Sequence, residues 1–312
     1  MSTREILKES TLRKRYHNIF ELTHRFLGWT SILLFWTQLL LTKSSVTGVN
    51  STSFFNTLLR TPTFWILSLM TMLVVRLWLR VRTWTFHPTV LSPHAIQLHF
   101  TKRVHKFSCL SISTAPLQEW HPFATFPMSP RGSTKAGTRT EPCIIISDAG
   151  DWTRSIIQKA RDMQSLENKG LLEEQPAMRF WVKTTPIPGV LSLTTLFSRV
   201  LLITTGSGIG PCLSSLLDRP PGQFIRLVWS TRSPLATYGA DILASVYAAD
   251  PDALIIDTDV VGRPDLVRVA YGIWRAIRAE AVFVLSNEVV TRKVVYGLES
   301  RDIPAFGPIF DS

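Results

Sequence analysis

The C-terminal part of the chain, from Ser198 onward, alternates short apolar runs with longer amphipathic segments, and this rhythm limits the fold more than any other feature. Each apolar run is a candidate strand, and each is followed by a segment with helical spacing. The strands are predicted at 199–205, 224–230, 253–257 and 281–286. Strands that are apolar along their whole length and separated by helices are typical of a parallel sheet covered on both faces. We therefore predict an α/β domain over residues 198–312.

A glycine-rich turn joins the first of these strands to its helix. It reads Thr205-Gly206-Ser207-Gly208-Ile209-Gly210-Pro211. At such a turn, backbone N–H groups and the positive end of a helix dipole can meet a phosphate, and the missing Cβ atoms allow close approach. A tight structural turn without a ligand would look similar. The strand–turn–helix context favours nucleotide binding over that alternative.

Residues 86–190 have a different texture, with short β-prone runs separated by Pro, Gly and Ser. The runs lie at 95–100, 106–113, 143–147 and 178–183. This pattern is typical of a small antiparallel barrel or sandwich. One helix is predicted in this region, over 152–169, with Asp151 as its cap.

The N-terminal part carries two apolar runs. Phe26 to Thr42 is 17 residues without a charge, and Phe64 to Val75 extends to about residue 81 if Arg76 and Arg80 reach lipid headgroups. We predict a membrane anchor over residues 1–85, with two transmembrane helices at about 26–42 and 63–81. Two buried core helices are the alternative.

The net charge of +11 is concentrated beside these apolar runs. Residues 1–25 hold six Lys/Arg against three Glu, and residues 76–106 contain no Asp or Glu. The positive-inside rule then predicts an integral membrane protein with both termini and the C-terminal domains in the cytosol. Basic flanks also favour anionic lipids, so the lipid bilayer is an expected partner. No nucleic-acid-binding motif accompanies the charge, and nucleic acid is therefore not an expected partner.

The three cysteines, Cys109, Cys143 and Cys212, are scattered along the chain. They form neither a CxxC motif nor a cluster with His, so no metal site is expected, and an odd number argues against a disulfide framework. This usage fits a reducing compartment such as the cytosol.

The glycine turn resembles that of the ferredoxin–NADP⁺ reductase superfamily, particularly its membrane branch of ferric reductases and NADPH oxidases. In that branch a T-G-x-G-I-x-P turn binds the nicotinamide dinucleotide, which implies this role for residues 205–211. After the next strand the family places a polar segment at the adenosine 2′-phosphate, and this chain has Ser230-Thr231-Arg232-Ser233 there. The resemblance thus implies NADPH (or NADH) as a cofactor, with Thr231 and Arg232 at the 2′-phosphate. An Arg at a sheet edge can equally be a solvated surface residue.

Other elements resemble the same family. Gly262-Arg263-Pro264-Asp265 is similar to the family element that opens the following helix, which implies that Arg263 also contacts the cofactor. The segment Glu119-Trp120-His121-Pro122-Phe123-Ala124 is similar to the H-P-F-[TS] signature, which lines FAD in the membrane branch. Gly150-Asp151-Trp152-Thr153 resembles the family's G-x-W-T element. By resemblance, the FAD-binding residues would be His121, Pro122, Phe123, Trp152 and Thr153. For His121, a loop histidine ahead of a turn proline is the alternative.

Two further positions follow from the same resemblance. Pro188 and Gly189, in Thr185-Pro186-Ile187-Pro188-Gly189, stand where the family joins its two domains and touches FAD phosphates. Phe310 corresponds to the C-terminal aromatic residue that stacks on the flavin, with burial in the core as the alternative. The expected fold is therefore a two-span membrane hairpin, then a small antiparallel β-barrel of the FAD type, then the α/β nucleotide-binding domain.

The chain departs from the family in two respects. The family's C-G-P segment is replaced by Ser286-Asn287-Glu288, which removes the thiol beside the nicotinamide. No pair of histidines lies inside an apolar run, so haem is not expected. Nearly the whole chain resembles fungal integral-membrane flavin-reductase-like proteins, some of which are related to C-terminal regions of adenylate-forming, synthetase-like proteins.

The resulting hypothesis is a membrane-anchored flavin-dependent oxidoreductase that moves electrons from NAD(P)H through FAD to an unknown acceptor. The missing Cys leaves open a catalytically decayed, reductase-like membrane protein with a binding or regulatory role. A tailoring oxidoreductase of secondary metabolism, acting on a lipophilic substrate, is the third alternative.

Overall fold

The computed structural model describes residues 17–50, 53–128, 140–171 and 175–308, which form two compact units. One unit contains the N-terminal helices together with residues 115–119. The other contains both sheets, over residues 83–114 and from 120 onward. The two units are described separately.

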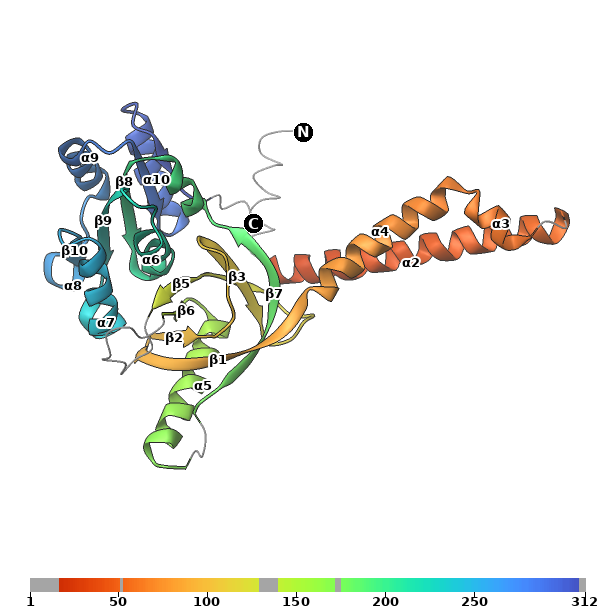
Figure 1. The fold of residues 1–312 in the computed structure, drawn as a ribbon, viewed down its shortest axis with the longest axis horizontal. Coiled ribbons are helices and arrows are strands. Elements are labelled where there is room, and N and C mark those ends of the chain that lie inside the picture. Colours follow the sequence, from red (N-terminus) through yellow and green to blue (C-terminus); the bar gives the residue numbers. More distant parts are fainter. Residues whose placement is uncertain (1–16, 51–52, 129–139, 172–174, 309–312) are drawn as a thin grey trace. The chain divides into compact units, whose positions relative to one another are not determined.

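The first unit is a set of three helices, α2 (His17–Asn50), α3 (Phe54–Leu59) and α4 (Pro62–Leu79) (Figure 1). Leu39, Leu58 and Leu67, one from each helix, form its small buried cluster. The indole N–H of Trp36 donates to the Thr71 hydroxyl at 3.0 Å and so links α2 to α4. Most other apolar side chains of the helices are exposed.

Among the described helices, only α4 is long and apolar enough to cross a bilayer, as judged from length and composition. Both predicted spans are helical, but the predicted two-span hairpin is not supported, because only α4 among the described helices meets the length and hydropathy of a span. Helix α2 misses the criterion because Thr, Ser, Gln and Lys interrupt its apolar residues, as in Thr37-Gln38 and Thr42-Lys43.

The second unit begins with a seven-stranded sheet in the order β4-β3-β7-β1-β2-β6-β5. The strands are β1 (Val81–Ser92), β2 (Ala95–His99), β3 (Ser108–Ser113), β4 (His121–Ala124), β5 (Phe126–Met128), β6 (Glu141–Ser147) and β7 (Met178–Pro188). The pairs β1–β2, β2–β6, β3–β4, β3–β7 and β5–β6 are antiparallel, as predicted. Helix α5 (Asp151–Asn168) covers a core that includes Phe86, Phe100 and Phe180. We refer to this part as the antiparallel domain.

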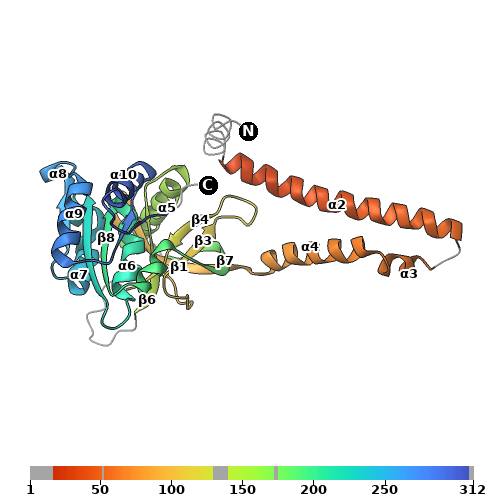
Figure 2. The same cartoon turned by 90° about the horizontal axis from the view of Figure 1, so that it is seen from above.

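The chain then passes through η1 (Val190–Leu196) into a five-stranded parallel sheet in the order β10-β9-β8-β11-β12. The strands are β8 (Arg199–Thr205), β9 (Phe224–Thr231), β10 (Leu254–Asp257), β11 (Ala281–Leu285) and β12 (Ala305–Phe306). The helices between them are η2 (Gly206–Gly208), α6 (Ile209–Leu217), α7 (Pro234–Ala249), α8 (Thr258–Val261), α9 (Leu266–Ile277) and α10 (Glu288–Glu299) (Figure 2). The predicted parallel α/β domain is thus confirmed. We call it the parallel domain.

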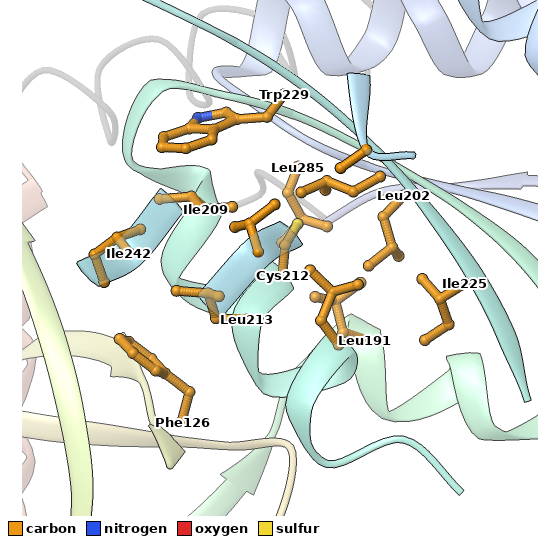
Figure 3. Packing of buried hydrophobic residues seen from close by; sticks show 14 of the residues in the cluster. Phe126, Leu191, Leu202, Ile209, Cys212, Leu213, Ile225, Trp229, Ile242 and Leu285 are labelled. Atoms are coloured by element: carbon orange, nitrogen blue, oxygen red, sulfur yellow. The ribbon is translucent and has the colours of Figure 1, made fainter. Parts of the chain in front are cut away.

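Each strand of the parallel sheet contributes to a core on both faces, which explains why its sequence is apolar without alternation. In β8, Val200 and Leu202 belong to the cluster with α6 and α7, whereas Leu201 and Ile203 belong to the cluster with α9 and α10. Phe126 of the antiparallel domain joins the first cluster beside α6 (Figure 3). The two domains therefore share one core, which fixes the glycine turn against the antiparallel sheet.

Candidate functional site

The glycine turn between β8 and α6 is held by its own backbone and by two neighbouring strands. Gly206 has φ of +51°, in the region that favours glycine, and its carbonyl accepts a 2.9 Å hydrogen bond from the Trp229 indole. At Gly208, a Cβ would lie 2.3 Å from the Thr204 hydroxyl oxygen and 2.7 Å from the Leu285 carbonyl oxygen. Gly206 therefore sets the path of the backbone, and Gly208 allows the turn to pack against β11.

Helix α6 starts within this turn, with Gly208 as its N-cap residue, and no side chain caps it. The first N–H groups of a helix have no partner within the helix, and they carry the positive end of its dipole. The Ile209 N–H donates to the Gly206 and Ser207 carbonyls within the turn, and Pro211 has no N–H, so the turn offers mainly the positive end of the helix dipole at the carboxyl edge of the sheet.

A cleft of about 570 Å³, the carboxyl-edge cleft, opens over the ends of the parallel strands. Five of the predicted cofactor-binding residues line it: Thr205, Gly206, Thr231, Arg232 and Arg263. Ser230 of the predicted 2′-phosphate segment also lines the cleft, together with five polar residues that were not expected there from the sequence: His94, Thr237, Thr258, Asn287 and Lys293. The remaining lining is Pro264 with an apolar floor between α9 and α10, formed by Leu266, Val267, Val290 and Val294. Three cations from three separate elements therefore border one cleft: Arg232, Arg263 and Lys293.

The cation after β9 has an acidic neighbour. Arg232 Nε lies 4.0 Å from Asp259 Oδ1, and the Ser233 hydroxyl donates to Asp259 Oδ2 at 2.9 Å. Asp257 Oδ1 accepts 3.0 Å hydrogen bonds from the backbone N–H of both Ser233 and Asp259. These bonds fasten the loop after β9, where Ser233 has φ of +35°, to the start of α8.

A second cleft, of about 590 Å³, lies between the two domains and is called the interdomain cleft. The turn residues Thr205, Gly206, Ser207, Gly208, Gly210 and Pro211 form one side of it. Pro122, Phe123 and Ala124 of β4, together with Ile145, Ser147, Ala149 and Thr153, form the other. Leu285, Ser286, Asn287 and Pro308 complete the lining. Thr205, Gly206 and Asn287 also line the carboxyl-edge cleft, so the two clefts adjoin.

Behind the interdomain cleft, the predicted flavin residues His121 and Trp152 pack against each other. Their rings stack at 4.0 Å between centroids and 26°, and Phe123 stacks on Trp152 at 6.2 Å. Neither His121 nor Trp152 lines the cleft. The Trp152 indole N–H is buried without a hydrogen-bond partner among the described residues.

The Thr153 side chain is bonded to the loop that precedes α5. Its oxygen accepts from the backbone N–H groups of Ala149 and Gly150 at 2.9 and 3.0 Å, and its O–H donates to the Gly150 carbonyl at 2.9 Å. Such bonds cap the start of a helix. Thr153 therefore shapes the wall of the cleft through the backbone it holds.

The segment that replaces the family's C-G-P lies at the junction of the clefts. The Ser286 hydroxyl forms a short hydrogen bond with the Thr205 hydroxyl, and the Ser286 backbone N–H donates to Thr291 Oγ1 at 3.2 Å. Asn287 caps α10 by accepting from the Val290 N–H at 3.0 Å. Two paired hydroxyls thus stand at the junction of the two clefts.

Several predicted residues lie elsewhere. Ile209 is fully buried in the core. Pro188 ends β7 beside β3, and Gly189 follows it before η1 and donates its N–H to the Phe107 carbonyl at 3.2 Å. Neither cleft includes these three residues. Phe310 lies outside the described residues.

Two of the cysteines lie in the core as buried thiols. Burial raises the pKa of Cys143 and of Cys212 to about 12, so both remain neutral thiols at pH 7. Over the described ranges, no group of three or more His, Cys, Asp or Glu residues could hold a metal ion.

Comparison with known sequences links the chain to fungal reductases. It is 38% identical over 311 residues to adenylate-forming reductase 03009 from Coprinopsis cinerea, covering 96% of this chain and 27% of that protein. It is 38% identical over 303 residues to adenylate-forming reductase 06235 of the same fungus, again covering 96% of this chain and 27% of the relative. Residues 190–312 match the family described as the C-terminal domain of adenylate-forming reductase 03009. The chain thus spans about a quarter of the length of these curated relatives.

Comparison with solved structures finds partial similarity. A ferredoxin–NADP⁺ reductase from Plasmodium falciparum with 2′P-AMP has a TM-score of 0.46 at 10% identity, covering 73% of this chain and 96% of that one. An NADH-dependent reduced ferredoxin–NADP oxidoreductase has a TM-score of 0.49 at 12% identity, covering 73% of this chain and 75% of that one.

Proposed function

We propose that this chain is a flavin-dependent oxidoreductase, in which NADPH occupies the carboxyl-edge cleft and FAD occupies the interdomain cleft. The observation that carries the proposal is that the two clefts meet at the glycine turn and share Thr205, Gly206 and Asn287. A dinucleotide bound along the sheet edge would have one end beside the first cleft's cations and the other beside the second cleft. The chain's similarity to adenylate-forming reductases also supports a reductase.

The residues present fit a phosphorylated dinucleotide. A Cβ at Gly206 would meet only the Tyr238 hydroxyl, at 3.9 Å, so the turn surface is open to a ligand. The uncapped start of α6 would bind the pyrophosphate. Cations and hydroxyl groups such as those of Thr231 and Thr258 would bind a phosphate dianion.

The residues present also fit a flavin, with a changed division of roles. The volume of the interdomain cleft lies within the range of cofactor sites. Pro122, Phe123 and Ala124 give it an apolar wall, and the buried, unpartnered Trp152 N–H is a free donor behind that wall. His121 and Trp152 would support this wall from behind, whereas the family resemblance implied direct contact; Thr153 lines the cleft, as that resemblance implied.

A bound flavin would supply the chemistry that couples two-electron transfer from a nicotinamide to one-electron acceptors. The chain itself would position the two rings, since the turn and β4 face each other across the interdomain cleft. The Thr205–Ser286 hydroxyl pair stands at the junction, where it would orient a carboxamide by hydrogen bonding. The shared apolar core under the turn would keep this spacing fixed.

An absorption spectrum of the purified full chain tests this proposal. We expect a yellow protein whose flavin band bleaches on anaerobic addition of NADPH. A protein that binds no FAD on reconstitution would refute it. If the protein binds nucleotide but NADPH does not bleach its flavin, a binding or regulatory role is favoured instead. The presence of Ser286, where the family resemblance implied a Cys, is the observation that makes this the second candidate.

We further propose that the first unit attaches the protein to a bilayer, with the sheets in the cytosol. The support is the apolar helix α4 and the exposed side chains around it, such as Leu33, Leu34, Ile66 and Leu77, which are 59–68% exposed. Exposed apolar surface of this extent marks an interaction site. Flotation with liposomes after alkaline carbonate washing should retain the full chain, whereas removal of residues 1–80 should release it. Retention of the shortened chain would contradict the assignment.

A further inference from the structure

Lys293 is a cation that no sequence motif singled out, and the fold brings it to the carboxyl-edge cleft from α10. Its neighbour Arg292 forms a 3.0 Å ion pair with Glu288, so the acidic side chain of that helix turn is paired with Arg292 and not with Lys293. Over the described residues, neither Lys293 nor Arg263 forms an ion pair. Asp265, the acid closest in sequence to Arg263, caps α9 by accepting from Val267 and Arg268 backbone N–H groups.

Arg232 stands in a different electrostatic setting. Asp259 lies 4.0 Å from it, and Asp257 holds the same loop. A phosphate that approached Arg232 would meet the Asp259 carboxylate as well as the guanidinium. Because like charges repel at these distances, Arg232 is the weakest of the three cations as a phosphate ligand.

The floor of the cleft beside Lys293 is suited to a flat apolar group. Leu266 and Val294 are 9% and 1% exposed, and Val267 and Val290 lie beside them. An adenine ring placed there would bring its ribose phosphate toward the cations on α10 and before α9. Two cations together with an apolar floor match a 2′-phosphorylated adenosine.

We propose that Lys293, acting with Arg263, determines specificity for the 2′-phosphate, and that Asp259 keeps Arg232 in a secondary role. This assignment rests on the proposed nucleotide site and specifies which residues bind the 2′-phosphate of the nucleotide. Lys293 binds the phosphate directly through its ammonium group, and Arg263 supplies the forked guanidinium.

Calorimetric titration of the detergent-purified full chain with 2′-phospho-AMP and with AMP tests this inference without requiring flavin. Since a charged hydrogen bond is lost, Lys293→Gln should weaken 2′-phospho-AMP binding about tenfold or more. It should change AMP binding less than twofold, and Lys293→Arg should restore most of the loss. Arg292→Gln is the matched control, because it removes an exposed cation one position away that does not line the cleft; it should change neither affinity. Asp259→Asn should strengthen 2′-phospho-AMP binding about threefold, because Arg232 then becomes available.

The outcomes separate the inference from the proposed function. If wild type binds 2′-phospho-AMP more tightly than AMP and Lys293→Gln keeps that preference, the inference is wrong and the nucleotide site stands. The same holds if Arg232→Gln alone abolishes the preference. If wild type binds neither compound, both the site and the inference are wrong. Equal melting temperatures of the variants would exclude misfolding as the cause of any loss.

Discussion

The antiparallel and parallel domains present their candidate site residues in different ways. In the parallel domain the cations Arg232, Arg263 and Lys293 lie on loops and a helix surface, outside the buried clusters. In the antiparallel domain, His121 and Trp152 stack on each other, and the Thr153 hydroxyl is bonded to its own loop. These three residues build the fold, and Thr153 also lines the interdomain cleft.

This difference predicts how each domain responds to mutation. Changes at the parallel domain's cations should alter ligand binding and leave stability unchanged. Changes at the antiparallel domain's residues should alter both together. Gly208 is the exception in the parallel domain, because it belongs to the turn and also packs against β11.

The largest effect is expected for Gly208→Ala. Its Cβ would meet the Thr204 hydroxyl oxygen at 2.3 Å and the Leu285 carbonyl at 2.7 Å, so the backbone must move. We expect a loss of about 3 kcal/mol in the free energy of unfolding, measured by denaturant titration, together with loss of nucleotide binding. Gly272→Ala is the matched control, since a Cβ there meets nothing within 4 Å in α9; it should be neutral or slightly stabilising. Equal stability of the two variants would mean that the turn does not pack as described.

The next largest effect is a pH dependence in the antiparallel domain. Burial, and to a lesser extent His87, lower the pKa of His99 from 6.5 to about 4. The folded-state pKa is below the unfolded one, so His99 favours the fold above pH 6.5 and this contribution is lost as the pH falls toward 4. The full loss corresponds to about 3 kcal/mol, from 2.5 pKa units at 1.36 kcal/mol each.

Denaturant titrations between pH 7 and 4 measure this slope. His99→Gln should flatten it, although the variant can be less stable at pH 7. His105→Gln, in an exposed loop, should keep the wild-type slope. If the pH dependence of stability is the same in His99→Gln as in the wild type, groups other than His99 cause it.

A smaller effect is expected for Thr153→Val, which keeps the shape of the side chain and removes its three hydrogen bonds. Loss of a helix cap should cost about 1–2 kcal/mol of stability, and FAD affinity should fall with it. Thr153→Ser should restore both. A variant of full stability that fails to bind FAD would assign Thr153 to direct contact and break the contrast between the domains.

The smallest effect on stability is expected for Arg263→Gln. Arg263 is exposed, and its replacement should change the free energy of unfolding by less than about 0.5 kcal/mol. NADPH affinity, measured by fluorescence titration, should still fall about tenfold, because the loss of one phosphate ligand is equivalent to roughly 1.4 kcal/mol. A large drop in stability would show that this cation is part of the fold.

The sequence was sufficient to predict the parallel domain because its signals are local. Apolar runs placed β8, β9, β10 and β11 nearly within their observed bounds, and the turn before α6 followed from its glycines. The short strand β12 was missed because its two residues, Ala305 and Phe306, are recognisable as a strand only through their pairing with β11.

Long-range placement explains the other differences. The sequence shows no reason to single out Lys293 among the exposed cations of α10, and only the packing of α10 against α9 brings it over the cleft. The family motif similarly implied ligand contacts for His121, whereas its position in β4 and the start of α5 bring it against Trp152. Side-chain partners of this kind depend on which elements become neighbours.

The hydrogen bond from Trp229 to the Gly206 carbonyl has a practical consequence. This indole is fully buried, yet its N–H is hydrogen-bonded to Gly206, the residue of the turn that a bound phosphate would approach. Movement of the turn must change the length of that bond, and therefore the resonance of this one ring. Because the chain has 10 tryptophans, fluorine-labelled indole spectra with a Trp229→Phe assignment variant would separate its signal. The protein thus contains an intrinsic probe of turn occupancy that needs neither a coloured cofactor nor a known substrate.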